Sequence, residues 1–107
     1  MGATTNQVRN VPGLHGSGNA SVTISAQNQW TDPISLGKGG YATLSINSLS
    51  DSTVTLQRKI DGTNWRDVDT WTADAEEDYY ASESQDIRLG VATGDYGTDS
   101  PVLRVGS

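Results

Sequence analysis

The sequence predicts an all-β protein: an antiparallel β-sandwich of about seven to eight short strands with an extended N-terminal arm. From residue 20 onward, apolar and polar residues alternate with a period of two, which is typical of strands that bury one face. Turn-forming residues separate these stretches, and Gly fills 12 of the 107 positions while Phe fills none, unlike a helical bundle. The pattern leaves open whether the strands connect as in immunoglobulin domains or as in jelly rolls.

Residues 1–19 are predicted to form the arm, and residues 20–107 the sandwich domain. The arm has no hydrophobic period and is rich in Gly, and it carries Arg9 but no acidic residue. Two interpretations stay open: a disordered terminus, or an arm that becomes ordered against a neighbouring subunit. In the second interpretation the partner-binding residues are Val8, Arg9, Val11, Pro12 and Leu14.

The first part of the domain contains three predicted strands. Residues 20–26 and residues 42–47 alternate apolar side chains with Ser, Thr or Asn. Residues 30–36 are also extended, but Asp32 and Pro33 interrupt them. Because proline has no N–H to donate to a neighbouring strand, this piece is expected at a sheet edge or at a bulge.

The second part contains two predicted hairpins. Residues 54–60 and 65–72 are β-favouring runs joined by an Asp-Gly turn, which predicts a hairpin. Residues 87–91 and 103–105 are expected to pair as a second hairpin across a Gly-rich loop. Only residues 73–78 are compatible with a helical turn.

One charged residue falls on an inward position of the first hairpin. Arg58 lies between Leu56 and Ile60 in the alternation, so its side chain is expected to face the core. A buried guanidinium needs an acidic partner, and Asp67 or Asp69 on the facing strand would supply one. The alternative is a bulge that turns Arg58 outward.

The composition excludes several function classes. A formal net charge of −6 and a pI near 4.4 argue against binding to nucleic-acid phosphates. The chain has no Cys, and its single imidazole, His15, lies in the arm, so neither a nucleophilic triad nor a thiolate or imidazole metal site is expected. No apolar run approaches the roughly 18 residues that span a membrane, and no secretory signal is expected. We therefore predict a non-enzymatic protein without catalytic residues, cofactor or metal ligands.

Two residue groups carry weaker alternatives. Seven acidic residues crowd into positions 61–78, which indicates either a solvated acidic face or a site for a hard cation such as calcium. The seven aromatic residues either fill the core or an interface, or several of them form an exposed surface on which sugar rings stack. The candidates for such a surface are Trp65, Trp71 and Tyr96.

Four stretches of the sequence carry a resemblance to a known group of proteins. Residues 53–68, 87–96 and 102–105, together with residues 24–34, resemble small β-sandwich virion proteins encoded by tailed bacteriophages. The adjacent Asp61 and Gly62 differ from the turn of carbohydrate-active Asp-box proteins, in which one residue separates Asp from Gly. The resemblance therefore implies a structural virion component and no catalytic residues.

The resemblance implies a capsid decoration, or cement, protein that binds the outside of a phage head and stabilises it. Such a protein is expected to be made in the host cytoplasm, to form homotrimers, and to bind the major capsid protein or another virion protein through its arm. Neither nucleic acid nor a membrane is an expected partner. Three alternatives stay open: a neck, tail or fibre-base component, a glycan-binding module, and a calcium-dependent adhesive domain.

Overall fold

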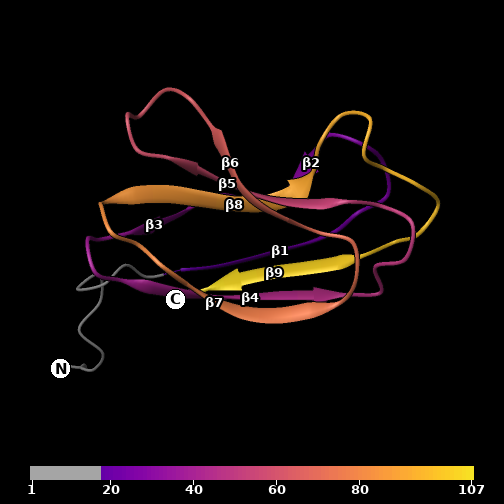
Figure 1. The fold of residues 1–107 in the computed structure, drawn as a ribbon, viewed down its shortest axis with the longest axis horizontal. Helices are drawn as coiled ribbons and strands as arrows, with labels where there is room; N and C mark the ends of the chain where they lie inside the picture. The colour runs from indigo at the N-terminus through magenta and orange to yellow at the C-terminus, as the bar shows by residue number, and fades with distance from the viewer. Residues whose placement is uncertain (1–17) are drawn as a thin grey trace, which may run out of the picture.

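The computed structural model describes residues 18–107, which form two antiparallel sheets packed face to face (Figure 1). The four-stranded sheet has the order β1-β9-β4-β7; the five-stranded sheet has the order β2-β8-β5-β6, with β3 also paired to β8. The predicted all-β sandwich is therefore confirmed. Nothing in the described range is a helix long and apolar enough to cross a membrane. The strands are β1 (Asn19–Thr23), β2 (Gln29–Trp30), β3 (Ile34–Leu36), β4 (Tyr41–Asn47), β5 (Val54–Lys59), β6 (Arg66–Trp71), β7 (Ala75–Tyr80), β8 (Gln85–Val91) and β9 (Val102–Gly106).

Strands at matching distances from the two ends of the domain pair with each other. β1 pairs with β9, β4 with β7 and β5 with β6, while β2 and β3 behave as one interrupted strand that pairs with β8. A long hairpin that is rolled up, so that successive pairs alternate between two sheets, produces this pattern. The connectivity is that of a jelly roll, one of the two arrangements that the sequence allows.

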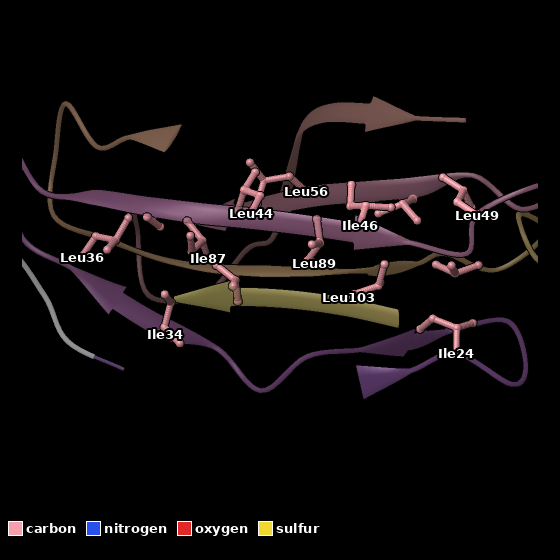
Figure 2. Close-up of a cluster of buried hydrophobic side chains, with 14 of the residues drawn as sticks. Ile24, Ile34, Leu36, Leu44, Ile46, Leu49, Leu56, Ile87, Leu89 and Leu103 are labelled. Carbon is pink, nitrogen blue, oxygen red and sulfur yellow. The ribbon is translucent and has the colours of Figure 1, made fainter. Parts of the chain in front are cut away.

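The core lies between the two sheets and follows from the period-two pattern (Figure 2). In β4, for example, Ala42, Leu44 and Ile46 are buried while Tyr41 and Thr43 are exposed. The outward residues of each sheet therefore form two broad outer faces. The largest buried side chains include Ile24, Leu36, Ile46, Leu56, Ile87, Leu89 and Leu103.

The interruption at Asp32 and Pro33 divides the edge strand into β2 and β3, as the proline predicts. Thr31 lies at the break and forms hydrogen bonds with Leu89 on the neighbouring strand β8. Its N–H donates to the Leu89 carbonyl at 2.8 Å, and its Oγ1 accepts the Leu89 N–H at 3.1 Å. The N–H and the hydroxyl of this buried residue are therefore both paired at the break.

Two sequence predictions are wrong. Residues 75–80 form β7 rather than a helical turn, because pairing with β4 places Tyr79 against the core and overrides the helix preference of the Ala and Glu residues. Strands β8 and β9 do not form a hairpin, because the loop between them crosses from the five-stranded to the four-stranded sheet.

The first hairpin, β5 and β6, forms as predicted and contains a register shift opposite Leu56 and Gln57. Arg58 keeps its inward parity, since its partner on β8 is the buried Ile87. Its side chain is half-buried and borders a hollow of about 380 Å³ at the hairpin tip, together with Asp67. The Asp67 carboxylate itself accepts a hydrogen bond from Gln57 Nε2 at 2.8 Å.

The hairpin turn is organised by a single carboxylate. Asp61 Oδ1 accepts the backbone N–H groups of Asn64 and Thr63 at 2.8 and 2.9 Å. Because these hydrogen bonds favour the charged carboxylate, they lower the pKa of Asp61 to about 2. Gly62 has a φ of 77°, which favours glycine at this position of the turn.

Candidate functional site

The acidic residues of positions 61–78 lie mainly on β6 and β7, the edge strands that follow one another along the chain. Several of their carboxylates accept hydrogen bonds from neighbouring strands, as Asp78 does from the Thr43 hydroxyl at 3.1 Å. In the part of the chain that the structure describes, no three His, Cys, Asp or Glu side chains gather to hold a metal ion. Charged residues on edge strands oppose pairing with strands of other molecules.

The outer face of the five-stranded sheet carries a stack of aromatic and cationic side chains, which we call the Trp-Arg stack: Trp30, Arg88, Trp65 and Lys59. The Arg88 guanidinium lies 4.3 Å from the ring centroids of both Trp30 and Trp65, and Lys59 Nζ lies 4.8 Å from the centroid of Trp65. Arg88 also donates from Nε and Nη2 to Gln57 Oε1 at 2.9 and 2.8 Å. The stack therefore connects β2, β8, β5 and the β5–β6 turn across one face.

Two local features hold the stack in place. A Cβ atom on Gly90 would lie 2.5 Å from the Trp30 ring, so only glycine allows the indole to lie this close to the sheet. The Trp30 indole N–H donates to Asn28 Oδ1 at 3.2 Å. Burial lowers the pKa of Arg88, but an arginine side chain remains charged at neutral pH.

Replacing Arg88 by Ala is expected to lower the free energy of unfolding by about 2 kcal/mol, because it removes two cation–π contacts and two hydrogen bonds. The free energy of unfolding of Arg88→Lys is expected to lie between those of the natural chain and Arg88→Ala, since an ammonium group keeps the charge but lacks the planar face. Arg104→Ala is the matched control on the opposite outer face, with an expected change within about 0.5 kcal/mol. Urea unfolding curves measure all three, and equal stabilities of the Arg88 and Arg104 variants would contradict the stack's role.

The outer face of the four-stranded sheet contains a polar hollow of about 510 Å³. Gly106, at the end of β9, lies in register with Thr43 on one side and Asn19 on the other, so the outer face of the sheet has no side chain at this position. Tyr41 forms part of the wall, and its ring lies 5.2 Å from that of Tyr80 at an interplanar angle of 59°. The remaining lining residues are Ser45, Glu76, Arg104 and Ser107.

Two aspartates, Asp51 and Asp99, join the loops at one end of the sandwich. We call this pair the aspartate clasp. Asp99 Oδ2 accepts the backbone N–H groups of Ser50, Asp51 and Ser52 at 2.7, 3.1 and 3.3 Å. Asp51 reciprocates, and its Oδ1 accepts the N–H groups of Thr98 and Asp99, each at 3.0 Å. The clasp joins the β4–β5 loop to the β8–β9 loop, and both loops cross between the sheets (Figure 1).

The hydrogen bonds of the clasp decide the charge of Asp99. Partial burial acts to raise its pKa, but the Ser50 N–H, the Ser52 hydroxyl and the Asp51 N–H together lower the pKa well below its ordinary value. Gly97 allows the loops to meet, since a Cβ there would lie 2.4 Å from the Asp51 carboxyl carbon. The clasp thus holds an ionised carboxylate at neutral pH.

The structure separates the aromatic residues that the sequence groups together. Trp65 belongs to the Trp-Arg stack, whereas Trp71 and Tyr96 are half-buried and pack against the core. The arm residues lie outside the described part of the chain: Val8, Arg9, Val11, Pro12 and Leu14.

Sequence reasoning missed Arg88 and Arg104 as surface features, and it did not single out Trp30 or Tyr41 among the aromatic residues. A signal was present for two of them: Arg88 alternates with buried Ile87 and Leu89, and Tyr41 lies two positions before Thr43 on the outward parity of its strand. Parity alone does not show which outward residues from different strands become neighbours, because that depends on strand order.

These features define a jelly-roll domain with two side-chain clusters on opposite outer faces and a clasp at one end. Compared with models of known protein families and with curated protein sequences, the chain matches none of them.

Proposed function

We propose that the protein is a non-enzymatic virion structural protein: a decoration protein that binds the outside of a tailed-phage head and stabilises it. The single observation that carries the proposal is the jelly-roll sandwich, to which the sequence resemblance to small phage virion proteins adds. Jelly rolls recur in viral capsid domains, and this domain has the same strand connectivity. The neck, tail or fibre base is the alternative position within the same particle.

The surface supports a role in binding rather than in chemistry. The described residues carry no His or Cys, and several of their carboxylates accept hydrogen bonds from turns, loops and neighbouring strands. Edge strand β7 carries Glu76, Glu77 and Asp78, which keep it from pairing with strands of other copies. Contacts with other subunits of an assembly would then be made by the two outer faces of the sandwich and by the arm.

The arm joins the sandwich at a defined place. The carbonyl of Gly18 accepts the Ser107 N–H at 3.0 Å, beside the start of edge strand β1. The arm sequence combines Val8, Val11 and Leu14 with Arg9 and no acid, in a chain with a net charge of −6. Such a segment suits an acidic or apolar surface on a capsid subunit, and each bound copy would stabilise the assembled shell.

Deletion of residues 1–17 is expected to leave the sandwich folded and to reduce binding to phage heads by at least about tenfold. Co-sedimentation with purified heads measures binding, and circular dichroism checks the fold. Replacement of Val11 and Leu14 by Ser should reproduce most of the loss, whereas replacement of Thr4 and Thr5 by Ser, the same number of substitutions in the same segment, should not.

Three results would overturn the proposal or a part of it. Undiminished head binding by the deletion variant would remove the role of the arm. Absence of the protein from purified particles would remove the virion assignment altogether, and cryo-electron microscopy that places it only at the neck or tail would replace decoration by the alternative position.

A further inference from the structure

We infer that the hollow on the outer face of the four-stranded sheet is a binding site for a neutral saccharide. This inference does not depend on the proposed role in the virion, since it rests on the side chains of β1, β4, β7 and β9 alone. The volume of the hollow, about 510 Å³, falls within the range of small-ligand sites, roughly 300–1,000 Å³.

The floor of the hollow is made of small residues. Gly106 contributes only backbone, and Thr43 and Ser45 on the neighbouring strand contribute hydroxyl groups. These hydroxyls donate to Asp78 and Glu76, and each hydroxyl oxygen can still accept a hydrogen bond from a ligand. A flat ligand that carries hydroxyl groups of its own can therefore approach the sheet closely at this point.

The aromatic wall is unusually exposed for its size. Tyr41, which lines the hollow, and Tyr80, which packs against Tyr41 outside the lining, have exposed fractions of 60% and 54%. Such rings present an apolar face and a phenolic hydroxyl to a ligand, and tyrosines lose little conformational freedom when they bind. The apolar C–H faces of a sugar ring are a suitable partner for this wall.

The opposite wall supplies oriented polar groups. Asn19 Oδ1 accepts from both Nε and Nη2 of Arg104 at 3.3 Å, which fixes the guanidinium while its remaining N–H groups stay exposed. Glu76 adds acceptor oxygens across the hollow, and its Oε2 lies 3.4 Å from the Ser45 hydroxyl. Donors and acceptors thus surround a hydroxyl floor.

Charge selects a neutral ligand over a charged one. Arg104 and Glu76 offset each other within the hollow, and Asp78, two positions along β7 and outside the lining, accepts the Thr43 hydroxyl. An anion such as a phosphate would meet the Glu76 carboxylate, and a cation would meet the Arg104 guanidinium. An apolar ligand would leave these groups without partners. A polyhydroxylated, uncharged ring satisfies all of them.

The test uses the full chain and a panel of methyl glycosides and trisaccharides of glucose, galactose, mannose and N-acetylglucosamine. Saturation-transfer NMR is expected to detect at least one of these sugars, with a Kd on the order of 1 mM. Amide shifts should map to Thr43 and Gly106. Tyr41→Ala and Arg104→Ala should each weaken binding by about tenfold, which corresponds to roughly 1.4 kcal/mol.

One control variant and one further variant accompany these substitutions. Trp65→Ala changes an aromatic residue on the opposite outer face and should leave sugar binding unchanged. Gly106→Ala places a Cβ 2.9 Å from Asn19 Oδ1, a flexible side-chain atom, so it should fill the floor and weaken binding without unfolding the protein. The inference is overturned if no sugar of the panel binds at about 20 mM, if binding survives both wall substitutions, or if it follows Trp65.

Discussion

Replacing Asp99 by Ala is expected to lower the free energy of unfolding by about 3 kcal/mol at pH 7. The substitution leaves the N–H groups of Ser50, Asp51 and Ser52 without their shared acceptor, and it also removes the partner of the Ser52 hydroxyl. Ser52 is only 2% exposed, so water cannot easily replace the carboxylate there. Urea unfolding at neutral pH measures the loss.

The same substitution should change the dependence of stability on pH. Because the pKa of Asp99 is lowered in the folded state, its contribution is fully present above the ordinary aspartate pKa of about 3.9 and is lost as the pH falls towards the folded value. The difference between the natural chain and Asp99→Ala should therefore be constant from about pH 5 to 7 and shrink below about pH 4. Asp61 titrates in the same acidic range, but it is present in both proteins and cancels in the comparison.

A neighbouring aspartate serves as the control for the clasp. Asp95 lies in the same β8–β9 loop but outside the clasp, and Asp95→Ala keeps the backbone N–H and carbonyl through which this residue contacts Ala92 and Thr53. Its effect should stay below about 1 kcal/mol. If Asp95→Ala and Asp99→Ala have equal effects, the clasp contributes no more than an ordinary surface carboxylate.

The clasp also shows why one part of the fold escaped prediction. A Gly-rich loop between two alternating runs is typical of a hairpin, so residues 87–91 and 103–105 were expected to pair. In the structure the loop is anchored to the β4–β5 loop by Asp51 and Asp99, and it carries the chain into the other sheet. Contacts between residues this distant in sequence leave no local pattern.

Elements that depend on local pattern were predictable. β4 and the β5–β6 hairpin follow from alternation and from the Asp-Gly turn, and Pro33 correctly indicated an interrupted edge strand. β7 was not predictable in this way, because its sequence contains Glu76, Glu77 and Asp78 on an exposed edge and shows no alternating apolar face. Only its pairing with β4 makes it a strand.

The candidate sites depend even more on strand order. The Trp-Arg stack brings together Trp30 from β2, Arg88 from β8 and Trp65 from the β5–β6 turn. The polar hollow likewise needs Asn19 and Arg104 beside Tyr41. Outward parity is readable in the sequence for each strand, but the neighbours across a face follow from the jelly-roll connectivity, which the sequence left undecided.

Replacing Leu89 by Ala is expected to cost about 3–4 kcal/mol, the largest effect of any single substitution considered for this domain. Leu89 has no exposed surface and lies on β8, which pairs with β2, β3 and β5. Its neighbours belong to a paired strand on each side, so the sheet cannot collapse into the space that the side chain leaves. A small domain has a total stability of only about 5–15 kcal/mol, so the variant should melt at a much lower temperature.

Val102→Ala provides the matched control, since this residue also loses methyl groups within a strand but is 41% exposed. Its effect should stay below about 1 kcal/mol. Calorimetry on the two variants separates burial from strand position, because both residues lie in hydrogen-bonded strands and differ in the face they occupy. Similar melting temperatures would mean that the interior around Leu89 rearranges to fill the cavity, and that the two sheets are less tightly packed than their buried side chains indicate.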